Sequence, residues 1–437
     1  MNAFASFDEL SAHLEKLGLF RMRPELGRLR AVLSALEERA PLRLANVNAQ
    51  IAGTNGKGST STFIASIAMA HGRKTGLFTS PHFVTFRERI RVNGEMASEA
   101  LLLEEANRVM AVGGETLTYF ELVTVLAALV FAREKAEAVI WETGLGGTWD
   151  ATTALDADMV AYAPIGLDHC AILGETLAAI AMDKAGAMRP GRPVFTAPQP
   201  PDALRVLEET AKGKNCALTV VPPLPGTIPL GLSGGHQQTN AALALAVWRE
   251  MAARAGWESS PVKEAAGLGS AFIPGRLQYV PPCQEKGHPA FLLDGAHNGH
   301  GMAALGKALA GAGIAPAAVI FSCLEDKLKT DLIPHLRVLA TGPIVVPPIP
   351  GNPRALPPDK IAENIGLAAS PAPSMEGAIQ KAAAHIAAYL PEEAAAHPER
   401  HPVLICGSLY MLGDFFTLRP DCLTPPLAPP VEKSGKK

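Results

Sequence analysis

The chain has 437 residues, of which 48% are hydrophobic and 19% are charged, and its formal net charge is −3. This composition is typical of a globular, core-rich protein, and the length is too great for one ordinary core, so we expect two domains or at most three. The small negative charge argues against a nucleic-acid partner or an anionic membrane surface.

The six cysteines are scattered without any CxxC pair. This distribution favours reduced, mostly buried thiols over a disulfide or zinc framework. The N-terminal residues lack the basic and apolar regions of a secretion signal, and no apolar run reaches the length of a membrane span. We therefore expect a cytoplasmic protein.

Two helices are predicted at the start of the chain. Residues 7–38 carry apolar side chains at helical spacing, and the pattern breaks near Phe20–Pro24. A short apolar run, Val47–Ala52, then precedes a glycine-rich stretch, Gly53–Thr60, and a segment of small and apolar residues. We interpret this order as strand, glycine loop and helix.

The glycine loop is the first candidate site. Its backbone N–H groups and the helix N-terminus would attract phosphate, and Lys57 could reach terminal phosphate oxygens. The common phosphate loop has glycine where this chain has Ile51, and Ser or Thr where it has Gly58. A glycine turn that serves packing alone is the alternative, but the strand and helix on either side favour nucleotide binding.

A second strand is expected at Thr75–Thr79, followed by a turn at Ser80-Pro81-His82. The segment Phe86–Gly94 then carries three arginines. They could form a solvated face or bind an anionic substrate tail, and the residues leave both interpretations open.

Two carboxylates follow. Leu117–Arg133 is predicted to be a strongly apolar helix, in which Glu121 could simply complement the helix dipole. A buried strand, Ala138–Trp141, ends in Glu142 before a glycine-rich turn. A carboxylate at this strand end faces the crevice where α/β sheets bind ligands, and it could hold Mg²⁺ or merely face water.

The next predicted strand, Met159–Ala163, leads to Asp168 and His169, and a helix with Asp183–Gly186 follows. A lone histidine is more often structural than a ligand. However, Glu142 and His169 at neighbouring strand ends beside a phosphate loop would form a plausible metal site.

The further alternation of strands and helices predicts an α/β fold with a large, doubly wound, mostly parallel sheet of the P-loop type. A Pro- and Gly-rich stretch from Pro274 to Pro289 is interpreted as a linker to a smaller, Rossmann-like α/β domain. The expected domains are residues 1–285 and 286–424, and the tail at 425–437 is predicted to be disordered.

Together the motifs resemble one family over nearly the whole chain, the folylpolyglutamate synthase and dihydrofolate synthase group of the Mur ligase superfamily. The motifs that carry the resemblance, in order, are GTNGKGS at Gly53–Ser59, TSPH at Thr79–His82, TYFE at Thr118–Glu121, ETGLGG at Glu142–Gly147, GLDH at Gly166–His169, DKAG at Asp183–Gly186, PGR at Pro274–Arg276 and DGAHN at Asp294–Asn298.

The resemblance implies an ATP-dependent amide ligase that joins L-glutamate to dihydropteroate or a reduced folate. ATP would phosphorylate the carboxylate to an acyl phosphate, which the glutamate amine would then attack. Two Mg²⁺ ions and a carbamylated Lys184 are implied as well, and ATP would lie between the two domains. The enzyme is expected to be a monomer that binds no nucleic acid and no membrane.

The resemblance also implies roles for single residues. The expected catalytic residues are Lys57, Lys184 and His297. The expected ATP-binding residues are Gly53, Thr54, Asn55, Gly56, Lys57, Gly58, Ser59, Thr60, Asn240, Arg276 and Asp294. The expected metal ligands are Ser80 and Glu142 for the first ion and His169 and Lys184 for the second. The expected substrate contacts are Met22, Arg23, Pro24, Thr118, Tyr119, Phe120, Glu121, Trp149, Asp150 and Ala151, with Lys327 and Ser408 for glutamate.

The chain departs from the family at two places. Thr148-Trp149 stands where the family usually has Arg-Leu, and Leu328 follows Lys327 where the family has Asp. A Mur ligase that acts on a nucleotide-sugar peptide is the nearest alternative, but the TYFE and SPH segments fit folate better. A nucleotide-dependent switch is a further alternative, although it would not need the DGAHN segment.

Overall fold

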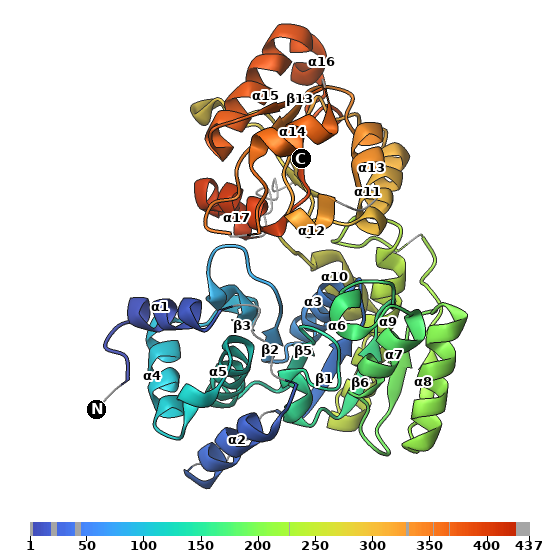
Figure 1. Ribbon diagram of the computed structural model, residues 1–437. Coiled ribbons are helices and arrows are strands. Elements are labelled where there is room, and N and C mark those ends of the chain that lie inside the picture. Colours follow the sequence, from blue (N-terminus) through green and yellow to red (C-terminus); the bar gives the residue numbers. More distant parts are fainter. Residues whose placement is uncertain are drawn as a thin grey trace, which may run out of the picture. The chain divides into compact units, whose positions relative to one another are not determined.

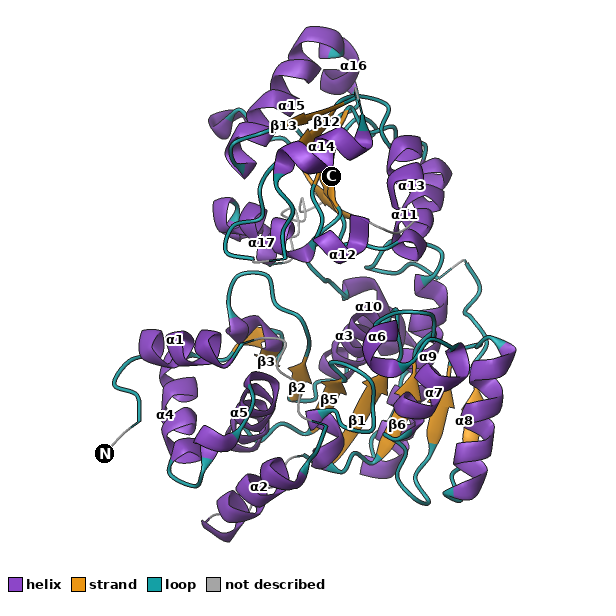
Figure 2. Cartoon of the chain, in the orientation of Figure 1, coloured by secondary structure: helices purple, strands orange, loops and turns teal. Residues whose placement is uncertain are grey.

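The computed structural model describes residues 3–18, 24–39, 45–226, 228–328, 332–352, 354–366 and 368–424. The chain forms two compact units. The larger comprises Met1–Gly231 and Gly235–Ala271, and the smaller comprises Leu232–Gly234 and Phe272–Lys437. Figures 1 and 2 show the elements of each unit.

The larger unit alternates strands and helices. Its strands are β1 (Val47–Ala52), β2 (Thr75–Phe78), β3 (Ile90–Val92), β4 (Glu95–Met96), β5 (Ala138–Glu142), β6 (Met159–Tyr162), β7 (Val194–Thr196) and β8 (Leu218–Val220). Its helices are α1 (Phe7–Leu17), α2 (Gly27–Arg39), α3 (Lys57–Ala70), α4 (Glu99–Met110), α5 (Tyr119–Arg133), α6 (Cys170–Leu173), α7 (Leu177–Ala185), α8 (Pro201–Gly213), α9 (Gln237–Ala255) and α10 (Pro261–Ser270), with 3-10 turns η1 (Phe86–Arg89), η2 (Gly114–Thr116) and η3 (Ala151–Leu155).

In the described part of this unit the strands form one sheet in the order β4-β3-β2-β5-β1-β6-β7-β8. The pairs from β2 to β8 are parallel, and β3 and β4 add an antiparallel hairpin at one edge. β1 lies between β5 and β6, and all of its residues are buried, as expected for a central parallel strand. The carboxyl end of β1 therefore lies in the middle of the sheet.

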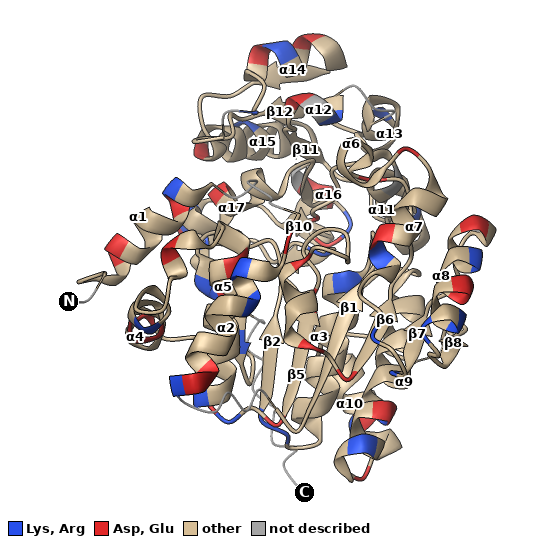
Figure 3. Cartoon of the chain, turned by 60° about the horizontal axis from the view of Figure 1, so that its bottom comes forward, with Lys and Arg blue, Asp and Glu red and all other residues tan. Residues whose placement is uncertain are grey.

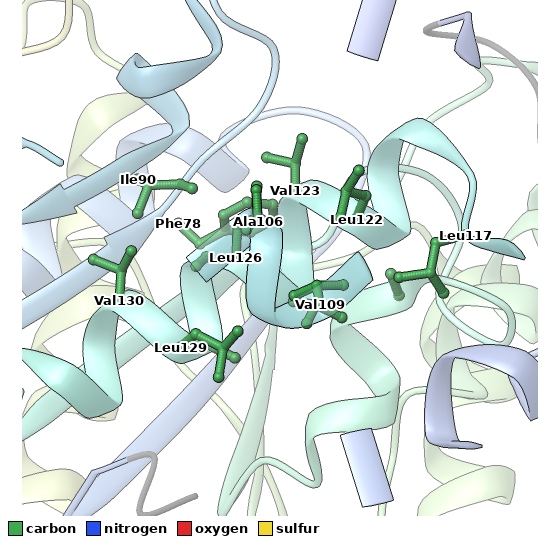
Figure 4. Close-up of a cluster of buried hydrophobic side chains, with 14 of the residues drawn as sticks. Phe78, Ile90, Ala106, Val109, Leu117, Leu122, Val123, Leu126, Leu129 and Val130 are labelled. Carbon is green, nitrogen blue, oxygen red and sulfur yellow. The ribbon is translucent and has the colours of Figure 1, made fainter. Parts of the chain in front are cut away.

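Helices α4 and α5 form an apolar layer next to β2 and β5. The buried side chains of α5 pack with Phe78 of β2 and with Trp141 of β5, whose rings lie 5.9 Å apart. Figure 4 shows part of this cluster, with side chains of α4 and α5 together with Phe78 of β2 and Ile90 of β3. Because α5 is apolar almost all round, it is buried, as helices of this kind are in larger domains.

The other helices complete the doubly wound arrangement. Helix α3 packs on β1, β2 and β5 and is itself covered by α9 and α10. Helices α7 and α8 pack together and bury an apolar cluster with Val160 and Tyr162 of β6. On α8, acidic and basic segments alternate, so this helix presents no surface of a single charge (Figure 3).

The smaller unit has a second sheet with the order β13-β12-β11-β14-β10-β9 among its described residues. All pairs are parallel except β9 with β10. Its strands are β9 (Gln278–Val280), β10 (Phe291–Leu293), β11 (Ala318–Phe321), β12 (Ile344–Val346), β13 (Ala369–Pro371) and β14 (Val403–Cys406). Its helices are α11 (Gly299–Ala312), α12 (Glu325–Leu328), α13 (Leu332–Leu339), α14 (Pro358–Ile365), α15 (Met375–Tyr389), α16 (Pro391–Ala396) and α17 (Leu409–Leu418), with 3-10 turns η4 (Gln284–Lys286) and η5 (Pro420–Leu423).

The predicted fold class, a large mostly parallel α/β sheet with a second α/β unit, is confirmed. The interpretation of Pro274–Pro289 as a linker is wrong, because β9 lies within this stretch and pairs with β10 of the smaller sheet. The division between the units accordingly lies at Ala271 and Phe272 rather than at residues 285 and 286. The predicted disordered tail lies outside the described residues.

No helix in the described ranges is both long and apolar enough to cross a membrane.

Candidate functional site

The glycine loop connects β1 to α3, in the order strand, loop and helix that the sequence predicts. Gly56 precedes α3 in the left-handed region, with φ 87°. A Cβ at this position would lie 2.3 Å from Oδ1 of Asn240, a buried residue of α9. Glycine is therefore required at position 56, and the close approach brings Asn240 against the loop.

Two loop N–H groups are already engaged. Thr54 and Asn55 donate to the carbonyl of Pro164, at 3.0 and 3.1 Å, and so attach the loop to the segment after β6. The first helical bond of α3 runs from Thr60 N–H to the carbonyl of Gly56. The N–H groups at the very start of α3 precede this bond, so they could donate hydrogen bonds to an anion.

Two lysines meet at this loop. The Nζ of Lys57 donates to the carbonyl of Thr54 at 3.2 Å, and the Nζ of Lys184, on α7, donates to the carbonyl of Gly53 at 2.9 Å. Lys184 is only 3% exposed. Burial, and next the positive charge of Lys57, lower the pKa of Lys184 to about 7. Near neutral pH a substantial fraction of Lys184 is therefore an uncharged amine.

Glu142 ends β5 and is buried beside the same loop. Its Oε2 accepts the N–H of Ser80 at 2.8 Å. A Cβ on Gly58 would lie 3.3 Å from Oε1 of Glu142, so the absence of a side chain at Gly58 leaves this carboxylate against the first turn of α3. The structure thus brings Ser80, Glu142 and the glycine loop together.

His169 lies in a different setting. It precedes α6 in the left-handed region, with φ 51°, and its side chain is 51% exposed, with Nε2 3.9 Å from Oδ2 of Asp168. The expectation that Glu142 and His169 follow neighbouring strands is wrong, because β1 separates β5 from β6. Within the part of the chain that is described, no group of three His, Cys, Asp or Glu side chains could hold a metal ion.

The segment Thr118–Glu121 is fixed by its own glutamate. Oε2 of Glu121 accepts the N–H and the hydroxyl of Thr118, both at 2.8 Å, at the start of α5. Arg28 of α2 donates Nε to Oε2 and NH2 to Oε1 of the same carboxylate, at 2.9 and 2.8 Å. Glu121 therefore completes the capping box at the start of α5 and also pairs with the largely buried side chain of Arg28. The sequence pattern did not indicate this pairing.

The glycine turn after Glu142 is held on two sides. A Cβ on Gly144 would lie 2.6 Å from the ring of Phe120, and one on Gly147 would lie 2.5 Å from the carbonyl of Lys184. Asp150 is buried and accepts the N–H groups of Gly144 and Leu145 at 2.9 and 3.0 Å. Burial raises the pKa of Asp150, although these hydrogen bonds oppose the rise.

The remaining predicted substrate residues of this unit differ in exposure. Trp149 is 47% exposed, whereas Ala151 and Tyr119 are buried. Pro24 is exposed, and Met22 and Arg23 lie outside the described residues.

The three arginines of the segment after Ser80 all take partners within the chain. Arg87 binds Glu99 at 2.7 Å, and Arg91 donates to the carbonyl of Gly94 at 3.0 Å. Arg89 is buried and donates Nε to Nδ1 of His82 at 2.7 Å.

The same guanidinium lies over the Tyr119 ring, 5.4 Å from its centroid. Burial, and next the charge of Arg89, lower the pKa of His82 to about 3, so His82 stays a neutral acceptor. Arg89 thus links the TSPH segment to the start of α5.

In the smaller unit the predicted residues gather at the carboxyl ends of β10 and β14. Asp294 accepts the N–H groups of Leu277 and Ala296, at 3.0 and 2.9 Å, and Nδ1 of His297 lies 2.7 Å from the carbonyl of Gly295. A Cβ on Gly295 would lie 3.1 Å from NH1 of Arg276. Arg276, Asp294 and His297 are therefore close to one another.

Ser408 is buried and caps α17, where its hydroxyl accepts the N–H of Tyr410 at 3.2 Å. Lys327 lies in the short helix α12, after β11.

Comparison with known proteins agrees with this geometry. A family described as Mur ligase, glutamate ligase domain, matches residues 275–408. A folylpolyglutamate synthase of Arabidopsis thaliana is 42% identical over 282 residues, which are 59% of this chain and 49% of that protein. The chain thus spans about half the length of this plant relative.

Two solved structures are similar over nearly the whole chain. The structure of E. coli FolC in complex with DHPP and ADP matches this chain with a TM-score of 0.80 and 27% sequence identity. The match covers 96% of this chain and 99% of the FolC chain. The bifunctional folylpolyglutamate synthase/dihydrofolate synthase of Yersinia pestis, complexed with AMPPNP and Mn ion, has a TM-score of 0.79, 26% identity and coverages of 96% and 99%.

The decisive likeness is to the dihydrofolate synthase/folylpolyglutamate synthase of Bacillus subtilis, which is 34% identical over 375 residues, or 77% of this chain and 84% of that protein. At this extent of identity and coverage, and with the Mur ligase match at residues 275–408, the chain belongs to the folylpolyglutamate synthase/dihydrofolate synthase family of Mur ligases.

Proposed function

We propose that this chain is an ATP-dependent ligase that adds L-glutamate to dihydropteroate, to a reduced folate, or to both, with ADP and phosphate as products. The observation that carries the proposal is the pair of lysines at the glycine loop, with the Glu142 carboxylate against the first turn of the following helix. The complex of E. coli FolC with DHPP and ADP supports the same substrate classes.

The chemistry requires an activated acid. A carboxylate is a poor acyl donor, so transfer of the γ-phosphoryl group to its oxygen would give an acyl phosphate with a good leaving group. The amine of glutamate would then attack the acyl carbon, a C–N bond would form, and phosphate would leave with the C–O bond electrons. Lys57 would stabilise the negative charge on the transferring phosphoryl group.

The residues around Glu142 fit a divalent cation. Carboxylate and hydroxyl oxygens are the ligands that Mg²⁺ prefers, and Mg²⁺ usually takes only one or two carboxylates from the protein, with waters and phosphates completing the shell. Glu142 and Ser80 would hold a first ion, and His169 and Lys184 a second. When bound, Mg²⁺ neutralises phosphate oxygens that would otherwise repel the incoming groups. The Mn ion of the Yersinia pestis relative supports a divalent metal in this role.

Lys184 would serve as a carbamate. Its low pKa supplies the neutral amine that CO₂ requires, and its position at the carbonyl of Gly53 is beside the glycine loop. The amine nitrogen would form a bond to the carbon of CO₂ and lose a proton, which gives an anionic ligand. Lys184→Ala should then lose activity that short-chain carboxylates partly restore, whereas Lys184→Arg should stay inactive. A bare amine in a metal-loaded crystal at high resolution would contradict this role.

The other predicted residues complete the proposal. Asn240, Arg276 and Asp294 would contact ATP, and His297 would act in catalysis. The segments Thr118–Glu121 and Trp149–Ala151 would form the pterin side, and Lys327 and Ser408 would receive the carboxylates of glutamate. We expect the protein to act as a monomer.

The test is turnover of purified protein with dihydropteroate or tetrahydrofolate, each with ATP, Mg²⁺ and L-glutamate. We expect ADP release only when both the acid and glutamate are present. Turnover of dihydropteroate would indicate dihydrofolate synthase activity, and turnover of tetrahydrofolate would indicate folylpolyglutamate synthase activity. ADP release without the acid would indicate a nucleotide switch instead. Turnover only with a nucleotide-sugar peptide would indicate another branch of the Mur ligases.

A further inference from the structure

The first turn of α5 is held by an arginine from a distant part of the chain. Arg28 approaches Glu121 with two parallel N–H bonds, and it also contacts Glu25. The two side chains are 11% and 6% exposed, and 93 positions separate them in the sequence. Parallel bonds of this kind fix the orientation of both groups as well as their distance.

The Glu121 carboxylate accepts four hydrogen bonds from the protein, two from Arg28 and two from Thr118. A carboxylate has about four favourable acceptor positions. Three of these bonds end on Oε2 and one on Oε1, so most of the bonding capacity of this carboxylate is used within the protein, and Glu121 orients its neighbours.

The ion pair is not needed to attach α2. That helix already buries Leu29, Val32 and Leu36 in the apolar cluster that includes α5. Burying a charged pair costs desolvation energy that can exceed the attraction between the charges, so the pair is weak evidence for added stability. The geometry that the pair imposes here is that of the turn Thr118–Glu121.

This turn positions Phe120 against the glycine turn that follows Glu142. The Phe120 ring occupies the space that a side chain on Gly144 would need, and it lies 5.6 Å from the ring of Phe78. A shift of the first turn of α5 would therefore move Phe120 and release the backbone at Gly144. Arg28 acts on this contact only through Glu121.

We infer that Arg28 is a positioning residue for the acid substrate, holding the start of α5 in the conformation that binds the pterin side of dihydropteroate or folate. The inference rests on the proposed function. Loss of the Arg28 side chain should weaken binding of the acid and leave binding of ATP unaltered, because the contacts of Arg28 with Glu121 and of Phe120 with Gly144 lie at the start of α5 and after β5 rather than in the glycine loop.

The test compares Arg28→Ala and Arg28→Lys with a matched control, Arg249→Ala. Arg249 of α9 makes the same two-bond contact with Glu264 of α10, at 2.9 and 2.7 Å, though its guanidinium is more exposed. We expect Arg28→Ala to raise KM for the acid about tenfold or more while KM for ATP stays within about twofold. Arg28→Lys keeps the charge but not the parallel bonds, so its KM for the acid should lie between those of the unaltered protein and Arg28→Ala. It also tests the inference if Arg28→Ala folds poorly. Arg249→Ala should change neither KM.

Two results would overturn the inference: an unchanged KM for the acid in both Arg28 variants, or an equal rise in KM for acid and ATP in Arg28→Ala and Arg249→Ala. If the unaltered protein turns over none of the acids, the proposed function itself fails and the inference falls with it. If the unaltered protein turns over the acid and both Arg28 variants keep its KM for the acid, the inference fails but the proposed function stands.

Discussion

At the carboxyl edge of the larger sheet, β1 and β5 end in the glycine loop and in Glu142, with the amine of Lys184 buried alongside. In the smaller sheet, β10 and β14 are followed by Asp294 and Ser408, which accept backbone N–H groups of their own loops. Both edges are polar, but the first places a buried carboxylate and a buried amine beside a loop, whereas the second uses its polar side chains to shape turns. A polar residue at a strand end is thus not by itself a sign of chemistry.

The largest expected effect follows from removing a charge at the first edge. Lys57→Ala should lower kcat by about 10³- to 10⁵-fold, because the amine would stabilise the transferring phosphoryl group. Stopped-flow or steady-state ADP release measures this loss of kcat, and circular dichroism should show an unchanged fold.

Glu142→Ala should abolish Mg²⁺-dependent turnover. Metal dependence like that of the unaltered protein would contradict the assignment of Glu142 as a metal ligand.

The second effect concerns stability and pH. The pKa of Lys184 falls from 10.5 to about 7 in the folded state. Below pH 7 Lys184 is protonated in both the folded and the unfolded protein, and the folded protein bears the full cost of burying its charge. Between pH 7 and 10.5 only the unfolded state holds the proton, so the free energy of unfolding should rise with pH, by at most about 5 kcal/mol over the whole window.

Denaturant unfolding of metal-free protein in CO₂-free buffer at pH 7 and pH 9 measures this rise. The variant Lys184→Met has no amine to titrate, so its free energy of unfolding should rise by about 2 kcal/mol less than that of the unaltered protein over this interval. Equal slopes in the two proteins would show that Lys184 keeps an ordinary pKa.

The smallest effect is expected at the second edge. Ser408→Ala removes the N-cap of α17 and should cost about 1 kcal/mol of stability. Asn298→Ala is the matched control, since Asn298 caps α11 by accepting the N–H of Gly301 at 2.8 Å. If Ser408 also binds glutamate, only its variant should raise KM for glutamate. Equal behaviour of the two variants would leave Ser408 with a structural role alone.

The sequence predicts most of the fold because apolar strand runs and helical segments alternate regularly along the chain. The central strands are apolar runs bounded by glycine or polar turns. Several of them, such as Val47–Ala52 and Met159–Tyr162, are found at the predicted residues or within one residue of them. The strand Gln278–Val280 was missed, since prolines and glycines on both sides hide a short edge strand that needs its partner β10 to form.

The candidate site could be predicted only in part. Glycine loops and strand-end carboxylates are local patterns, so residues such as Lys57 and Glu142 could be singled out. The partners that decide their chemistry come from far along the chain: Arg28 for Glu121, Gly53 for Lys184 and Asn240 for Gly56. Spacing in sequence carries no sign of these contacts, and neither does it reveal the strand order that separates Glu142 from His169.

The central position of β1 also bears on how the chain is made. β1 ends at Ala52, but its partners β5 and β6 start at Ala138 and Met159. At ordinary translation speeds the 85 residues at 53–137, between β1 and β5, take on the order of 4–17 s to synthesise. For that time the apolar strand that carries the glycine loop has no sheet to join. The nascent chain should therefore be most dependent on chaperones, and most prone to aggregation, before its first parallel pair can close.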